Sequence, residues 1–324
     1  MIESWLKNYI SKKGAISMSR NKVVIVGSTN VDKFINVTRF PKPGETLHID
    51  QAQREFGGWK GANQAFAAGR LEAETTFVTK VGKEGNADFI IEDFKEASII
   101  TEYILTADNE ETGQAFITVS EDGQNTILVY GGANMTLSAK DVMAAEQPIT
   151  EADFVVAQLE VPIEAIEQAF KIAKANGVTT ILNPAPAIDL PKSLLAFTDI
   201  IIPNETEAEL LSGISITNQD SMKETVEYFF KLGISTVLIT LGEQGTYYAT
   251  ENEFNIVPSY KVKAIDTTAA GDTFIGAFVS QLNKDLSNLE QAIQFANQAS
   301  SITVQRQGAQ AAIPTRDEVI NVYK

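Results

Sequence analysis

The 324-residue sequence contains no cysteine and only one histidine, His48. The absence of cysteine excludes disulfide bonds, thiolate metal sites and cysteine nucleophiles. A single histidine excludes a multi-histidine metal centre, and because no G-x-S-x-G sequence accompanies it, a Ser-His-Asp hydrolase is disfavoured. The chain also lacks the P-loop sequence G-x-x-x-x-G-K-S/T and has no G-x-G-x-x-G after its first predicted strand. P-loop kinases and Rossmann dehydrogenases are therefore disfavoured as well.

Basic residues are in the minority, with 26 Lys and Arg against 42 Asp and Glu and a net charge of -16. Because nucleic-acid binding normally needs a basic face, a nucleic-acid partner is disfavoured. No apolar run reaches the roughly 18 residues that span a bilayer, so we expect no membrane partner. Residues 1–20 lack the apolar stretch and the cleavage site of a signal peptide. We therefore expect a disordered N-terminal extension over residues 1–20 and a cytoplasmic protein.

From Lys22 onward, short runs rich in β-branched residues alternate with helical patterns. Continuous apolar strands separated by helices indicate an α/β fold whose mainly parallel sheet is buried on both faces. Pro162 opens one such helix, which carries apolar residues at helical spacing and stops near Gly177. The predicted strands are 23–26, 153–157, 179–182, 199–202 and 236–240.

Two segments interrupt this alternation, near residues 33–53 and 112–131. In the first, runs at 33–37 and 46–52 flank a Pro-Lys-Pro-Gly turn. In the second, runs at 114–119 and 125–130 flank a turn containing Asp and Gly, which is a hairpin signal. We expect a small projecting β-sheet, whose free edges and single apolar face suit either a lid over a ligand or a dimer contact.

The most specific run is Asp266-Thr-Thr-Ala-Ala-Gly-Asp272-Thr-Phe274, ahead of a helix predicted over 276–282. Small residues before a helix let backbone N–H groups approach an anion, and the helix dipole favours negative charge there. Asp272 beside such an anion site is suited to accept a proton from an attacking hydroxyl. The alternative is that Asp272 only stabilises the start of the helix.

Three other sets of polar residues follow predicted strands or open helices. Asn30 and Asp32 follow the first strand and offer an amide and a carboxylate to paired sugar hydroxyls, although an Asx turn explains them equally well. The run Gly57-Gly-Trp-Lys-Gly-Ala-Asn-Gln-Ala65 is a glycine-rich turn into a helix predicted over 62–71. Asn204-Glu-Thr-Glu207 is a helix start in which Asn204 caps the helix and Glu207 reaches back to it.

The runs Gly57–Ala65 and Asp266–Phe274 together resemble the two signatures of the ribokinase-type (phosphofructokinase-B) sugar kinases, and the resemblance extends from about Lys22 to about Pro314. It implies a three-layer α/β/α catalytic domain over 21–324 with a small β-sheet lid. It also implies transfer of the γ-phosphoryl group of MgATP to a sugar hydroxyl. Fragments such as Gly27–Asp32, Asn183–Ala187 and Arg306–Gln310 resemble members that phosphorylate D-ribose at its 5-hydroxyl in ribose catabolism.

Two alternatives to the ribose assignment stay open. The first is a kinase of the same family that acts on 2-deoxyribose, fructose or adenosine. The second is a nucleotide-binding regulator without catalysis.

The same resemblance implies a role for each site residue. Asp272 is implied to be the catalytic base, helped by the backbone amides of Ala269, Ala270 and Gly271. The implied sugar-binding residues are Asn30, Asp32, Gly58, Trp59, Lys60, Gly61, Asn63 and Glu160. The implied nucleotide-binding residues are Asn204, Thr240, Gly242, Gly245, Gly271 and Asn297. Glu207 is implied to hold Mg²⁺ through water, and an activating K⁺ is implied at Asp266, Thr268, Thr303, Arg306 and Gly308, mostly through backbone carbonyls.

Two positions depart from the pattern of that family. Trp59 stands where the family usually has a small residue, so it either stacks on the sugar or crowds it. Ala312 stands where the family often has Ser, which removes one side-chain ligand from the implied cation site. The resemblance also implies a homodimer formed through the lid sheets.

Overall fold

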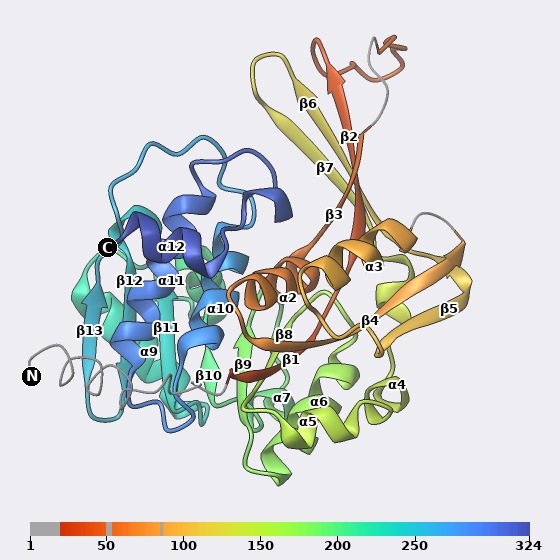
Figure 1. Ribbon diagram of the computed structural model, residues 1–324. Coiled ribbons are helices and arrows are strands. Elements are labelled where there is room, and N and C mark those ends of the chain that lie inside the picture. Colours follow the sequence, from red (N-terminus) through yellow and green to blue (C-terminus); the bar gives the residue numbers. More distant parts are fainter. Residues whose placement is uncertain (1–19, 50–53, 85–86) are drawn as a thin grey trace, which may run out of the picture.

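Two β-sheets organise the chain, and the computed structural model describes residues 20–49, 54–84 and 87–324. Within these residues the larger sheet has nine strands in the order β13-β12-β11-β10-β9-β8-β1-β4-β5 (Figure 1). Strands β11 to β5 in this order are parallel to one another, whereas β12 and β13 are attached antiparallel at one edge. The strands are β1 (Lys22–Val26), β4 (Glu74–Glu84), β5 (Ile104–Glu111), β8 (Phe154–Gln158), β9 (Thr179–Asn183), β10 (Ile200–Ile201), β11 (Thr236–Thr240), β12 (Thr246–Thr250) and β13 (Phe254–Val257).

Both faces of this sheet are buried because successive side chains of each strand point to opposite sides. In β1, Val23 and Ile25 pack into one core, and Val24 and Val26 pack into the other. The first core is closed by helices α2 (Lys60–Arg70), α3 (Ala87–Glu96), α10 (Ala270–Gln281), α11 (Leu289–Thr303) and α12 (Arg316–Val322). The second core is closed by α4 (Ala139–Met143), α5 (Glu146–Glu151), α6 (Ile163–Ala175), α7 (Lys192–Leu195), α8 (Glu205–Ser212) and α9 (Gln219–Lys231). The predicted three-layer α/β/α fold with a mainly parallel sheet is confirmed.

The second sheet has the order β3-β2-β6-β7 and projects from the main body (Figure 1). Its strands are β2 (Asn30–Val37), β3 (Arg54–Gly58), β6 (Gly113–Ser120) and β7 (Asn125–Tyr130), and the predicted β6–β7 hairpin is confirmed. The strand expected over 46–52 is wrong for residues 46–49, which form no strand, and residues 50–53 lie outside the described residues. The antiparallel partner of β2 is instead β3, which leads directly into α2. The sequence did not predict β3, because this strand has no run of β-branched residues and two of its five residues are glycine.

Two helix starts also differ from their predicted positions. Helix α10 begins at Ala270 rather than Gly276, and α2 begins at Lys60 rather than Ala62. In both cases small residues that suggested a loop form the first helical turn. Three short 3-10 helices, η1 (Gly132–Thr136), η2 (Gly242–Gln244) and η3 (Gln310–Ala312), complete the described secondary structure. The expected extension over 1–20 lies outside the described residues except for Arg20.

None of the helices in the described part of the chain is long and apolar enough to cross a membrane.

Candidate active site

The carboxyl ends of β1, β8, β9, β10 and β11 meet at one edge of the large sheet, where open α/β sheets bind ligands. A cavity of about 210 Å³ opens beside this edge. It brings together Lys60, Asn204, Glu207, Thr240 and the run 269–272, which the sequence placed in one site although they are far apart in the chain. The remaining lining residues are Asn183, Ala185, Ile202, Thr267 and Ile275.

The start of α10 is open toward this cavity. Ala269 precedes the helix in the left-handed conformation, at φ 59° and ψ 10°, and no side chain caps the helix. The N–H of Ala270 bonds to Thr267 O at 3.2 Å. Within the described residues, the N–H groups of Gly271 and Asp272 have no such acceptor. A Cβ at Gly271 would meet nothing within 4 Å, so there is open space beside this residue at the positive end of the helix.

Asp272 lies in the first turn of α10 and is 9% exposed. Its two oxygens accept hydrogen bonds from neutral amides of α2. Asn63 Nδ2 donates to Oδ2 and Gln64 Nε2 donates to Oδ1, each at 3.1 Å. These contacts hold a buried carboxylate without pairing it with a full positive charge.

The side chains of Asn30, Asp32 and Asn63 form a second polar group at the base of the small sheet. Each is buried, and each carries one atom without a hydrogen-bond partner: Asn30 Nδ2, Asp32 Oδ1 and Asn63 Oδ1. Gly58 lies against Asp32, because a Cβ there would come within 2.1 Å of Asp32 Oδ2. Burial raises the pKa of Asp32 to about 7. Buried donors and acceptors left unpaired in the protein suit a ligand that carries hydroxyl groups.

Glu160 and Lys60 add charge to the same site. Glu160 follows β8 by two residues, and its carboxylate accepts a hydrogen bond from Ser28 Oγ at 2.6 Å. Burial raises the pKa of Glu160 to about 8, although Ser28 and Lys60 act in the opposite direction. Burial lowers the pKa of Lys60, but the negative charges of Asp272, Glu160 and Glu207 outweigh it and leave that pKa above its usual value.

Trp59 is the residue before α2, and its backbone is strained. Its φ of 90° and ψ of 161° lie in a region that essentially only glycine occupies. Its neighbours explain why the backbone stays there. Gly58 pairs with Asn30 in the small sheet, and a Cβ at Gly61 would lie 2.5 Å from Ser28 N. The flanking contacts therefore impose a conformation that does not suit the tryptophan.

The start of α8 confirms the predicted helix cap. Glu207 N–H donates to Asn204 Oδ1 at 2.8 Å, and Asn204 N–H donates to Glu207 Oε2 at 3.0 Å. Burial raises the pKa of Glu207, which faces the cavity near Asp272 and Lys60. Both residues thus have a structural role and also line the cavity.

Three residues expected to bind the nucleotide do not line the cavity: Gly242, Gly245 and Asn297. Asn297 is 5% exposed, accepts from Thr246 Oγ1 at 3.0 Å and donates to Val257 O at 3.1 Å. A Cβ at Gly245 would come within 2.1 Å of Val257 O, so this glycine permits a close approach of two backbone segments. The contacts of Asn297 and Gly245 are thus with β12 and with the end of β13.

Of the five residues expected to hold a cation, three are joined directly. Asp266 Oδ1 accepts from Thr268 N at 2.9 Å, and Asp266 Oδ2 accepts from Gly308 N at 2.9 Å. Burial raises the pKa of Asp266, but the hydrogen bond from Thr268 Oγ1 at 2.6 Å and the two backbone hydrogen bonds outweigh it and hold that pKa below its usual value. Thr303 Oγ1 instead donates to Ala299 O at 3.2 Å, and the Arg306 guanidinium bonds to Glu318 at 2.8 Å. In the described part of the chain, no cluster of three or more His, Cys, Asp or Glu could hold a metal ion.

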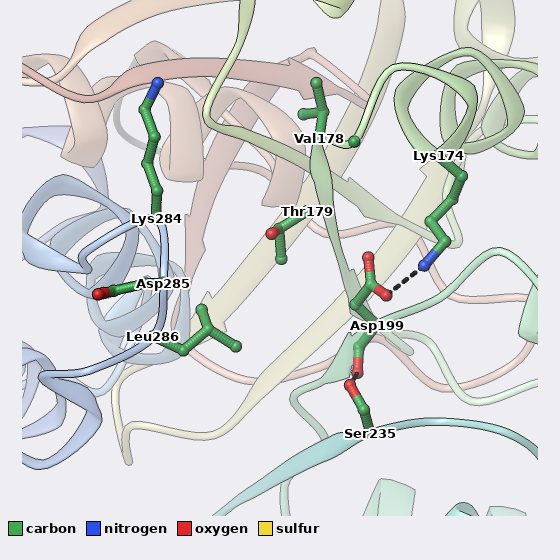
Figure 2. A pocket seen from close by; sticks show the side chains of 9 residues that line it. Lys174, Val178, Thr179, Asp199, Ser235, Lys284, Asp285 and Leu286 are labelled. Atoms are coloured by element: carbon green, nitrogen blue, oxygen red, sulfur yellow. Dashed lines mark hydrogen bonds and ion pairs between the residues drawn. The ribbon is translucent and has the colours of Figure 1, made fainter.

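A larger cavity, of about 330 Å³, lies at the opposite edge of the sheet (Figure 2). Its lining includes residues that precede strands, such as Val178 before β9, Asp199 before β10 and Ser235 before β11. The ammonium of Lys174 pairs there with Asp199, as Figure 2 shows. This cavity is separate from the residues that carry the chemistry.

Several residues at the site were missed by the sequence reasoning: Gln64, Asn183 and Gln158 near Asp272, and Ser28 and Asn134 near the sugar-binding candidates. The sequence could have identified Gln64 as a site residue, because Lys60, Asn63 and Gln64 have the i, i+3, i+4 spacing of one helix face. Asn134, which donates to Asn30 Oδ1 at 2.7 Å, lies on a separate 3-10 helix with no local signal.

Comparisons with known proteins agree with this geometry. The profile of the pfkB family carbohydrate kinases matches residues 20–316. The ribokinase of Staphylococcus aureus is 65% identical over 302 residues, which cover 93% of this chain and 99% of the relative. The deoxyribokinase of Salmonella typhi is 33% identical over 91% of this chain and 96% of its own. The structure of Arabidopsis thaliana ribokinase complexed with ribose and ATP superposes with a TM-score of 0.87 at 32% identity, over 95% of this chain and 99% of that chain.

Proposed function

The chain belongs to the pfkB family of carbohydrate kinases, and we propose that it transfers the γ-phosphoryl group of ATP to the 5-hydroxyl of D-ribose. It is an ATP-dependent carbohydrate kinase, as its high-identity relatives are. One observation carries the proposal: a buried carboxylate, Asp272, lies at the uncapped start of α10, where two backbone N–H groups have no acceptor among the described residues. This arrangement places a proton acceptor next to a binding site for an anion.

Asp272 accepts the proton of the attacking hydroxyl in this mechanism. The N–H groups of Gly271 and Asp272 stabilise the charge on the phosphoryl group during transfer, which is where most catalysis of such reactions resides. Ala269 supports them through its left-handed conformation, which turns the chain into the helix. The N–H of Ala270 is already bonded to Thr267 and acts mainly in positioning the turn.

The unpaired atoms of Asn30, Asp32 and Asn63 bind the hydroxyls of the sugar. An amide N–H₂ donates, while the carboxylate and the amide oxygen accept, so the three atoms match groups that both donate and accept. Lys60, Glu160 and the backbone at Gly58 and Gly61 complete the sugar site. Trp59 stands between two of these contacts and bounds the entrance to it.

On the nucleotide side, Asn204, Glu207, Thr240 and Gly271 line the cavity that receives the phosphates. Gly242, Gly245 and Asn297 act indirectly on the nucleotide. They shape the loop and the strands that support its adenine. Glu207 fits a Mg²⁺ that arrives with the nucleotide, since this ion typically keeps its waters and binds one or two carboxylates plus phosphates. When bound, it neutralises charge on the phosphates.

Asp266, Thr268, Thr303, Arg306 and Gly308 fit a K⁺ site, because hydrogen bonds bring the 266–268 and 303–308 loops together beside the start of α10. A carboxylate held ionised, with neighbouring carbonyls, suits a hard cation. A cation bound there would supply positive charge beside the loop that leads into Ala269. Ala312 contributes no side-chain oxygen.

The small sheet acts as the lid of the domain over 21–324 and also as the contact of a homodimer. Strand β7 lies at one edge of the small sheet, and Ile127, Leu128 and Val129 on it are 47%, 68% and 52% exposed. An exposed edge with apolar side chains favours pairing with another chain. Sedimentation velocity tests the dimer. Leu128→Asp is expected to yield monomers, and an unchanged dimer would exclude this surface.

The cytoplasmic location remains a prediction, testable by cell fractionation.

The decisive experiment measures ADP release with MgATP, with and without ribose and K⁺. We expect ribose-dependent release that falls when K⁺ is withdrawn. Asp272→Asn should still bind ribose but lose roughly three or more orders of magnitude in kcat. Near-normal turnover of that variant would rule out Asp272 as the base. Equal rates in K⁺, Na⁺ and Cs⁺ would remove the cation site from the proposal.

A second candidate substrate is 2-deoxyribose, favoured by the 33% identity to a deoxyribokinase. Running the same assay with ribose, 2-deoxyribose, fructose and adenosine separates these cases. We expect ribose to have the highest kcat/KM. A preference for 2-deoxyribose would revise the substrate but not the reaction.

A further inference from the structure

Three buried amide side chains form a hydrogen-bonded network that reaches Asp272 through Gln64, and neither the sequence reasoning nor the proposed mechanism uses them. Gln64 and Gln158 are 0% exposed, and Asn183 is 7% exposed. They come from α2, from β8 and from the last residue of β9. Gly27 leaves room for the Gln158 side chain, since a Cβ at residue 27 would lie 2.1 Å from Gln158 Oε1. Such side chains are buried at a cost that only specific hydrogen bonds offset.

The orientation of the Asn183 and Gln64 amides follows from one hydrogen bond to a backbone carbonyl. Asn183 Nδ2 donates to Ile202 O at 3.0 Å, and a carbonyl oxygen can only accept. Asn183 Oδ1 is therefore turned to Gln64, whose Nε2 donates to it at 3.1 Å. The same Nε2 donates to Asp272 Oδ1 at 3.1 Å. Gln64 Oε1 is left to accept from Gln158 Nε2 at 2.6 Å.

The consequence for Asp272 is a fixed carboxylate. A flipped Gln64 amide would place its oxygen against Asp272 and against Asn183 Oδ1, so that acceptor would face acceptor at both contacts. Asn63 holds the other oxygen, Oδ2, and both donors belong to adjacent residues of one helix. Each carboxylate oxygen can accept a second hydrogen bond, which leaves a site for the substrate hydroxyl. Two neutral donors orient the base and leave it able to take a proton.

From this geometry we infer that Gln64 is a positioning residue for the base Asp272, and that Asn183 fixes the orientation of the Gln64 amide. The inference rests on the proposed function of Asp272. Gln64 itself does not touch the substrate. Its contribution is to keep the carboxylate in the orientation that faces the hydroxyl.

The test is a double-mutant cycle between Gln64→Met and Asp272→Asn, with kcat and the KM for ribose measured for each form. Methionine is nearly the same length and removes the donor. We expect kcat of Gln64→Met to fall about 10–100-fold, because a misaligned catalytic group costs that order. The KM for ribose should stay within about 3-fold, since the sugar contacts remain. In the Asp272→Asn background, Gln64→Met should change the residual turnover less than about 2-fold, since coupled residues are not additive.

Two further variants separate positioning from stability. Asn21 Nδ2 donates to Val279 O at 2.8 Å and Leu282 O at 2.7 Å, at the far end of the same helix α10. Asn21→Leu is the matched control, expected to lower Tm but to keep kcat within about 2-fold. Asn183→Leu frees the Gln64 amide to turn, so kcat should fall about 3–30-fold even where Gln64→Met is not recovered folded.

Three outcomes would overturn the inference: an unchanged kcat in Gln64→Met, an effect confined to KM, or an equal fold-loss with and without Asp272. Failure of the proposed function is distinguishable from these, because the parent protein would then show no ribose-dependent turnover for Asp272→Asn to remove.

Discussion

Two helices, α8 and α10, begin at the same cavity in opposite ways. At α8, Asn204 and Glu207 satisfy the first free N–H groups with their own side chains. At α10, Ala269, Ala270 and Gly271 offer no capping side chain, and the amides of Gly271 and Asp272 stay open toward the cavity. Because the first N–H groups of any helix need acceptors, an uncapped start is stabilised when a ligand supplies them. This contrast supports the proposal that the start of α10 contacts the transferred phosphoryl group, whereas the side chains of Asn204 and Glu207 stabilise the start of α8.

Among variants at the three helix starts, the largest effect should come from blocking the start of α10. Gly271→Val adds a side chain where the protein itself has no atom within 4 Å of a Cβ, so folding should be little changed. The side chain would occupy the space in front of the amides, and kcat should fall about 100-fold or more, the order found when an oxyanion donor is lost. Steady-state kinetics and a thermal melt measure the two quantities. A variant with parental turnover would refute the phosphoryl site at α10.

A third helix start, that of α2, contains the strained backbone of Trp59, and variants at this residue measure the energy of that strain. Trp59 has φ 90° and ψ 161°, a conformation that costs non-glycine residues about 1–3 kcal/mol. Trp59→Gly should relieve this strain, whereas Trp59→Ala removes the same ring but keeps the Cβ. In urea unfolding we expect the glycine form to be more stable than the alanine form by about 1 kcal/mol, after allowing for the greater chain entropy of glycine. An alanine form of equal or higher stability would show that the backbone at residue 59 is not strained. Kinetics of the same pair would show whether the ring limits sugar binding.

The smallest effect should follow from removing the cap of α8. Asn204→Ala removes the acceptor for Glu207 N–H and should lower the free energy of unfolding by about 1 kcal/mol. Asn204→Ser restores a capping oxygen and should recover most of that loss. The pair also separates the two roles of Asn204. If the serine form regains stability but has a raised KM for ATP, the asparagine amide contacts the phosphates, and if both are regained, its role is only that of a cap.

The sequence predicted most of the large sheet correctly, and several of the predicted site residues line one cavity. Apolar runs such as Val23–Val26 and Thr236–Thr240 form central strands because both faces of a parallel sheet are buried. Asp272, Asn63 and Glu207 were placed in one site because the short runs that contain them resemble the signatures of the sugar-kinase family. The strand expected over 46–52 was wrong for residues 46–49, which form no strand, and the start of α10 was placed too late because Ala270 and Gly271 resemble a loop.

By itself, the sequence determined the fold class, the family and the chemical groups of the site, since these depend on periodicity and on short runs of contiguous residues. Only the tertiary structure decided how those groups are oriented. The strained backbone of Trp59 and the network of the Gln64, Gln158 and Asn183 amides depend on contacts between distant segments. An amide has no preferred direction until its neighbours accept or donate, and those neighbours lie up to 208 positions away in the chain.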